Sequence, residues 1–286
     1  MPNHTDPKRR HDFVLYFDCT DGNPNGDPDA GNLPRVDPET MQGLVTDVAI
    51  KRKIRDYIAA AKPGEERHKI YVEQYSVLNE QHERAWKALE LDPKTDKSRA
   101  NITKAKAWMC QNFFDVRMFG AVMSTEINCG QVRGPVQLTF ARSIDPIVPL
   151  DVTITRVAVT KSGEDKETEM GRKALIPYGL YRAHGFVTPQ FASDTGMEEE
   201  DLELLWKALV NMWELDRSAT RGMVACRGLY IFSHTSPLGD APAHKLFDRI
   251  SAKRREGVTA PRQFSDYELT VDAAELPDGV ALEKID

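Results

Sequence analysis

A loop near the start of the sequence has residue types that could bind a metal ion. Residues 21–26 read Asp-Gly-Asn-Pro-Asn-Gly and place side-chain oxygens at alternating positions before a glycine, as in the first half of a calcium-binding loop. The twelfth position, however, is Asn32 rather than a glutamate, and Pro24 and Pro28 interrupt the loop. We therefore predict a turn-rich binding loop with no metal, and a calcium-stabilised interaction module remains an alternative.

The cysteines and histidines form no catalytic or metal-binding motif. The four cysteines are far apart and include no CxxC pair, and the seven histidines include no HxxxH or HExxH pair. The nucleophile pattern GxSxG and the phosphate-loop pattern GxxxxGK[ST] are also absent from the sequence. We expect no cofactor and no catalytic residues, because nothing in these patterns requires either.

Basic residues on one expected helix could bind phosphates. The helix would cover residues 44–61, with Thr46 as its N-cap. At 100° per residue, Lys51 and Arg55 lie one turn apart beside the apolar stripe, whereas Arg52 faces away. Lys51 and Arg55 could therefore bind neighbouring phosphates together. The alternative is an ordinary solvated helix face.

The composition favours a single large domain with its own core. The chain has 286 residues, of which 41% are hydrophobic, and no apolar run approaches the roughly 20 residues of a membrane span. The first ten residues are polar and charged, so we expect a cytoplasmic protein without a membrane contact. The net charge is -6, and residues 263–286 alone carry seven acids and one base. The rest of the chain is neutral overall, which leaves room for a local basic patch.

Hydrophobic periodicity predicts an α+β fold. Strands are expected at 13–19, 131–140, 178–187, 226–233 and 267–271. In the second of these, Val132, Val136, Leu138 and Phe140 should face one way. A second helix should cover 195–213, with a capping box formed by Thr195 and Glu198. Residues 152–159 and a charged tip at 161–173 should form a protruding hairpin, and residues 62 to about 120 a helical insertion.

Without the insertion, the hairpin and the acidic segment, the order of the expected strands and helices is βαββαβ. This is the ferredoxin-like plan shared by RNA-recognition modules. The third strand partly matches the RNP1 signature of those modules, because Arg182, Gly185, Phe186 and Val187 agree with it. Ala183, His184 and Pro189 do not agree. If the match is real, base recognition by stacking should have moved away from this strand.

Four long segments together resemble a known family. They are DGNPNGDPDAGNLPR at 21–35, GLVTDVAIKRKIRDY at 43–57, DVRMFGAVMSTEINCGQVRGPVQLTFARSID at 115–145 and ATRGMVACRGLYIFSHTSPLG at 219–239. The sequence is similar, over about residues 11–271, to the backbone subunit of type I-C CRISPR surveillance complexes, in the Cas7 (Cas-seven) family.

The resemblance implies an RRM-like palm, a thumb hairpin and a helical finger insertion. The palm would take about 11–61, 120–150 and 178–272, the finger about 62–119, the thumb about 151–177, and an acidic tail 273–286. Several copies would polymerise head to tail along one CRISPR RNA and present it for pairing with target DNA. Further partners would be a Cas-five-type endonuclease and the large and small subunits of the complex called Cascade.

The resemblance also implies a set of RNA-binding residues. The first helix would contribute Lys51, Arg52 and Arg55, and the Asn/Pro loop would add Arg35. The thumb would bring Arg156, Lys161, Arg172 and Lys173 close to nucleic acid. Asn128, Gln131, Arg133 and Gln137 would line the groove. Because related subunits of type III complexes cut RNA with a loop acid, a metal-dependent RNA-cleaving enzyme using Asp27 or Asp29 is the alternative.

Overall fold

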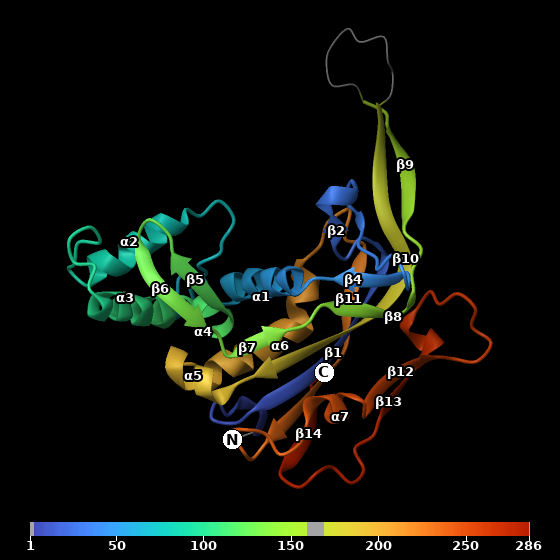
Figure 1. Ribbon diagram of the computed structural model, residues 1–286. Helices are drawn as coiled ribbons and strands as arrows, with labels where there is room; N and C mark the ends of the chain where they lie inside the picture. The colour runs from blue at the N-terminus through green and yellow to red at the C-terminus, as the bar shows by residue number, and fades with distance from the viewer. Residues whose placement is uncertain (1–2, 159–168, 286) are drawn as a thin grey trace.

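The computed structural model describes residues 3–158 and 169–285. Its centre is an antiparallel sheet whose strands differ in length (Figure 1). The strand order is β14-β11-β1-β10-β8-β4, and β7 and β9 also pair with β10. The strands are β1 (His11–Gly22), β4 (Gln42–Val45), β7 (Val136–Leu138), β8 (Ala141–Pro146), β9 (Leu150–Arg156), β10 (Glu169–Val187), β11 (Met223–His234) and β14 (Val280–Ile285).

Two helices cover one face of this sheet. They are α1 (Asp47–Ala61) and α6 (Glu199–Leu215), and they pack on Phe13, Leu15 and Phe17 of β1 in the largest apolar cluster. Thr46 caps α1 by accepting a hydrogen bond from the Ala49 backbone N–H, which confirms the predicted N-cap. Residues 44 and 45, which were expected within this helix, belong to β4 instead. Successive side chains of a strand alternate between faces, so Val14 and Tyr16 of β1 point to the other side.

That other face is covered by a small C-terminal layer. It contains α7 (Ala243–Phe247) and the hairpin of β12 (Ile250–Arg254) and β13 (Tyr267–Val271). Val14, Tyr16 and Leu180 form a buried cluster with Leu246 and Ile250 of this layer. The face that would carry RNP1-type stacking is therefore packed against protein: the His184 ring stacks on Phe247 with centroids 4.4 Å apart.

A helical lobe projects from the sheet beside α1 (Figure 1). It contains η3 (Glu66–His68), α2 (Leu78–Ala88), α3 (Arg99–Asn112), α4 (Phe114–Phe119) and the hairpin of β5 (Gly120–Ser124) and β6 (Asn128–Arg133). Its own core includes Trp86, Met109, Phe113 and Cys129. The short helix α5 (Pro189–Thr195) lies next to this lobe, as its contacts with α3 and α4 show.

The prediction of a single strand at 131–140 is wrong, because the strand is interrupted at Gly134 and Pro135. Residues up to Arg133 pair with β5 in the lobe, whereas Val136–Leu138 pairs with β10. A Cβ atom at Gly134 would lie 2.1 Å from the Phe119 carbonyl carbon, so the chain crosses the end of α4 where only a glycine fits. As a result Phe140 is 53% exposed instead of buried.

Two further expectations need correction. Gly196, at φ 71°, ends α5, and the second helix begins only at Glu199; its capping box joins Glu198 to Asp201 rather than to Thr195. The acidic segment after residue 272 also includes a strand, because Val280–Ile285 pairs with β11. Within the described residues, none of the helices is both long and apolar enough to cross a membrane.

Candidate nucleic-acid interface

The Asn/Pro loop is fixed to the start of α1 by its own polar groups. The Asn25 side-chain oxygen accepts the Thr46 backbone N–H at 2.9 Å, and the Arg35 backbone N–H donates to the Asn25 carbonyl at 3.1 Å. The Asn23 amide donates to the Asn32 carbonyl at 2.7 Å. Asp27 caps the short helix η2 (Pro28–Ala30), which lies between β2 (Gly26–Asp27) and β3 (Leu33–Pro34). The loop therefore presents Arg35 from a rigid support.

A basic hollow of about 580 Å³ lies between this loop and α1. We call it the Arg52 hollow, and its lining residues include Arg35, Arg52, Lys53, Arg221, Phe140 and Val48. Four cationic side chains line it, against the two acids Asp56 and Asp216. The Arg52 side chain is 66% exposed, and the large apolar side chains Phe140 and Val48 are 53% and 65% exposed. Exposed cations beside an exposed aromatic ring are the groups that hold single-stranded nucleic acid.

An ion-pair network around the buried Lys53 lines the Arg52 hollow. Asp216 pairs with the buried Lys53 and, at 3.3 Å, with Arg221. Arg221 also donates to the Asn23 carbonyl at 3.0 Å and so ties β11 to the Asn/Pro loop. Burial lowers the pKa of Lys53, and Asp216 acts against that shift. Lys53 is thus fixed inside the protein, Arg35 and Arg221 are half-buried, and Arg52 is the most exposed cation of the hollow.

Phe140 also lines a second hollow of about 410 Å³, which we call the His184 hollow. Gln42, Thr139, Arg142, Arg182 and His184 are among its other lining residues. Arg182 Nε and His184 Nε2 are buried and have no hydrogen-bond partner among the described residues. Burial lowers the pKa of His184 to about 4, so at neutral pH its ring is uncharged and offers one donor and one acceptor. Unpaired buried groups of this kind are costly unless a ligand satisfies them.

Lys51 and Arg55 lie on the other side of α1 and are occupied by the protein itself. Both side chains are 14% exposed and lie over the Phe119 ring, at 5.6 and 5.4 Å from its centroid. Lys51 pairs with Asp47 at 3.0 Å, and Arg55 with the buried Asp115 at 2.7 Å. Of the three basic residues predicted on this helix, only Arg52 therefore faces solvent in the Arg52 hollow.

The groove residues expected around residue 131 separate into two places. Asn128 and Gln131 belong to β6 in the helical lobe, where the Asn128 side chain accepts the Gly130 backbone N–H at 2.7 Å. Arg133 and Gln137 line a third hollow, of about 880 Å³, and the Arg133 guanidinium lies 4.4 Å from the centroid of the Phe191 ring. None of these four residues lines the Arg52 hollow.

The expected thumb residues lie on a two-stranded ribbon that projects from the sheet (Figure 1). β9 pairs with the first part of β10, with Arg172 opposite Thr153 and Lys173 opposite Val152. Arg172 is exposed and pairs with Asp151 at 3.1 Å, and Arg156 donates to the Ala158 carbonyl at 2.9 Å. Lys161 lies outside the described residues.

The loop acids of the enzyme alternative have structural contacts. Asp27 accepts the Asp29 backbone N–H at 3.2 Å and lies 3.5 Å from Arg35. Among the described residues, the single group of three His, Cys, Asp or Glu side chains close enough to share a metal is Glu65, His68 and Glu200. Asp27 and Asp29 are therefore not part of such a group.

Sequence reasoning missed Phe140 and Arg221 as members of the interface. Phe140 was assigned to a buried strand face, because the break at Gly134 has no signal in the alternating pattern. Arg221 lies in the segment at 219–239 that supported the family resemblance, but its contact with Asn23 joins residues almost 200 positions apart. Only the fold brings these two side chains to the same hollow.

The protein thus combines an antiparallel sheet and a projecting ribbon with a basic hollow beside α1. Residues 9–272 match the family CRISPR-associated protein Cas7. The chain therefore belongs to the Cas7 family, which confirms the resemblance at the level of the family.

Relatives and solved structures agree with this assignment. The CRISPR-associated protein Cas7 of Haloferax volcanii is 27% identical over 233 residues, which cover 71% of this chain and 64% of that protein. The chain thus spans less than two thirds of the length of this curated relative. A chain described as "CRISPR RNA-guided surveillance complex, pre-nicking" superposes with a TM-score of 0.52 at 13% identity, covering 82% of this chain and 79% of that one. At that identity the likeness concerns the fold.

Proposed function

We propose that this protein is a non-catalytic subunit that binds a CRISPR RNA and forms the backbone of a type I-C surveillance complex. Membership of the Cas7 family supports the backbone role. The observation that carries RNA binding is the Arg52 hollow, which is lined by the exposed Arg52, the half-buried Arg35 and the exposed ring of Phe140. The arginines would hold phosphates and Phe140 would stack on a base.

Within this proposal, the antiparallel sheet with α1 and α6 is an RRM-like palm. The β9–β10 ribbon is the thumb, and the helical lobe is the finger. Arg156, Lys161, Arg172 and Lys173 of the thumb would lie over the guide bound to a neighbouring copy. Copies would associate head to tail, a heterologous contact that continues along the RNA. The guide would pair with target DNA, and a Cas-five-type endonuclease with the large and small subunits would complete a cytoplasmic particle.

Guide sequence should not be read, because a polymer must accept any spacer. Binding would then depend mainly on phosphate contacts and stacking. Lys51 and Arg55 are largely buried and closely paired, whereas the ion pairs of Arg52 and Arg35 are longer. We therefore propose Arg52 and Arg35 as the first contacts on this side of the palm. Asn128, Gln131, Arg133 and Gln137 would contact nucleic acid or a neighbouring copy farther along the groove.

The experiment that tests the proposal is co-expression with the CRISPR array and the processing endonuclease. The purified material is characterised by its absorbance ratio at 260 and 280 nm and by light scattering. A large particle carrying protected RNA of one length is the expected result. A nucleic-acid-free monomer under the same conditions would contradict it.

The enzyme alternative is tested on the same particle. A bound RNA complementary to the guide is incubated with Mg²⁺ or Mn²⁺, and its length is followed over time. We expect no cleavage. Metal-dependent cleavage that is lost in Asp27→Ala or Asp29→Ala would instead establish catalysis by these loop acids.

A further inference from the structure

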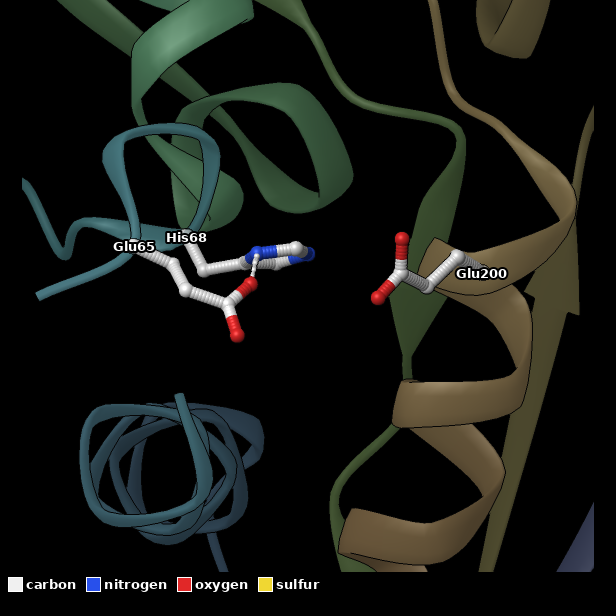
Figure 2. Close-up of side chains that lie close together, drawn as sticks. All are labelled: Glu65, His68 and Glu200. Carbon is white, nitrogen blue, oxygen red and sulfur yellow. Dashed lines mark hydrogen bonds and ion pairs between the residues drawn. The ribbon is translucent and has the colours of Figure 1, made fainter. Parts of the chain in front are cut away.

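Three side chains from two distant parts of the chain converge where the helical lobe meets α6. Glu65 precedes η3 and His68 ends it, whereas Glu200 lies in the first turn of α6. One potential ligand atom of each residue lies within 4.8 Å of those of the other two. Figure 2 shows the His68 ring between the two carboxylates. The group lies apart from the Arg52 hollow and shares none of that hollow's lining residues.

His68 has an unused nitrogen inside this group. Its side chain is 3% exposed, and its Nδ1 lies 2.9 Å from Glu65 Oε2. Nε2 is buried and has no hydrogen-bond partner among the described residues, and Figure 2 shows this end of the ring turned towards Glu200. A buried imidazole nitrogen without a partner is unfavourable. It is also the atom type that most often binds transition metals.

The two carboxylates already bind a positive charge. The Lys62 ammonium lies 2.8 Å from Glu200 Oε1 and 3.3 Å from Glu65 Oε1. The hydrogen bonds of this ammonium go to the two carboxylates, and His68 Nε2 receives none. A divalent metal ion would satisfy the same carboxylates and could also use the His68 lone pair. The Lys62 side chain is 24% exposed, so it has a path to solvent if it is displaced.

Neighbouring residues fix the position of Glu65 and His68 relative to Glu200. The buried Arg117 donates to Asp201 Oδ1 and Oδ2 at 2.6 and 2.9 Å and to the Arg67 carbonyl at 3.1 Å. Asp201 follows Glu200 in the chain, and Arg67 precedes His68. Arg117 therefore links the Asp201 side chain on one side of the group to the Arg67 backbone on the other, as a site with predefined ligand positions requires.

We propose that Glu65, His68 and Glu200 form a binding site for a divalent transition metal ion of the Zn²⁺ class, which replaces the Lys62 ammonium when it binds. One imidazole nitrogen and two carboxylate oxygens, with water in the remaining position, are ligands that suit Zn²⁺. Because the ligands come from η3 and from α6, the ion would brace the helical lobe against the sheet. Lys62 holds the same carboxylates as a monovalent substitute when no metal is bound.

The test uses the full-length chain, freed of metal with a chelator and titrated with Co²⁺, whose visible absorption reports its ligand geometry; Zn²⁺ is then added in competition. Removal of the competing ammonium in Lys62→Ala should tighten the binding of one metal ion at least tenfold relative to the wild type. Adding Glu200→Gln to that variant should weaken binding at least tenfold. His68→Gln should also abolish the four-coordinate Co²⁺ spectrum.

Glu73→Gln in the Lys62→Ala background is the matched control. Glu73 is an exposed acid that lines the same surface hollow as Glu65 and His68, but it is not in the group, so its loss should leave metal affinity unchanged. Glu200 is 51% exposed, so the Glu200→Gln protein should fold, which circular dichroism verifies. If Lys62→Ala binds metal no more tightly than the wild type, or if Glu200→Gln changes nothing, the site does not exist. Neither result depends on RNA binding.

Discussion

Arg55 Nε donates a 2.7 Å hydrogen bond to Asp115, a residue that is only 1% exposed. The same carboxylate accepts the backbone N–H groups of Tyr71 and Val72 at 2.8 and 3.0 Å. One buried acid thus joins α1 to α4 and to the segment between η3 and α2. Arg55 supplies the positive charge that makes this buried carboxylate tolerable.

Arg55→Ala should therefore destabilise the fold. Removal of one partner from a buried ion pair costs about 3 kcal/mol or more, which urea unfolding of the RNA-free protein will measure. Lys51→Ala, one turn away, is the matched control: its partner Asp47 is 22% exposed, so the loss should stay below about 1 kcal/mol. Equal stability of Arg55→Ala and the wild type would contradict the structural role.

Arg52→Ala should weaken RNA binding without destabilising the protein. Its side chain is 66% exposed and its weak partner Asp56 lies 3.8 Å away. Loss of one phosphate contact should lower the slope of log K against log salt by ~0.7 for a single strand. Fluorescence anisotropy with a CRISPR RNA at several salt concentrations gives this slope. Lys87→Ala, which removes an 80% exposed cation from α2, should leave it unchanged.

Phe140→Ala should weaken binding of single-stranded RNA, whatever its sequence. Stacking of one base on an aromatic side chain contributes about 1–3 kcal/mol, so the dissociation constant should rise by roughly fivefold or more. Phe140→Trp retains a stacking surface and should restore affinity. If Phe140→Leu binds as well as Phe140→Trp, the ring contributes area rather than stacking, and the proposed contact is wrong.

Stability should fall as the pH is lowered from 7.5 to 5. Burial lowers the pKa of His11 from 6.5 to about 4, and its ring bonds Ser233 and the Asp6 carbonyl. Between pH 6.5 and 4 the unfolded chain binds a proton that the folded protein excludes, so the unfolding free energy decreases as the pH is lowered through that window. At pH 5 the loss from His11 is about 2 kcal/mol.

Urea unfolding at the two pH values measures this dependence. His11→Asn removes the titrating group, so its stability should change less between pH 7.5 and 5 than that of the wild type. His244→Gln alters an exposed histidine and should keep the wild-type dependence. Parallel curves for the wild type and His11→Asn would show that His11 is not responsible.

Local signals predicted the main elements of the fold. The continuous apolar run at 13–19 predicted β1, and the N-cap at Thr46 predicted α1. Both signals depend only on residues that are adjacent in the sequence. The break after Arg133 was not predictable in this way, because it depends on contact between Gly134 and the end of α4. The start of α6 was also misplaced, although its signals are local, because Gly196 ends α5 and a capping box of Glu198 and Asp201 begins α6.

The candidate site could be predicted from the sequence only in part. The family resemblance indicated Arg35 and Arg52, and both line the Arg52 hollow. The helical wheel favoured Lys51 and Arg55 because it cannot show that Phe119 and Asp115 pack against that side of α1. Phe140 and Arg221 reach the hollow only through the arrangement of the sheet and the Asn/Pro loop.

The pairing of β14 with β11 has a consequence for how copies of the protein can meet. Residues 229–234 of β11 pair with β14 on one side and with β1 on the other. Without β14, an open strand edge would be available to pair with another chain, a common cause of aggregation. The edge of the sheet is therefore the 6-residue β14 rather than the 12-residue β11. A short edge strand leaves fewer backbone groups free to pair with another molecule, so association of copies at this border must depend more on side-chain surfaces than on shared backbone hydrogen bonds.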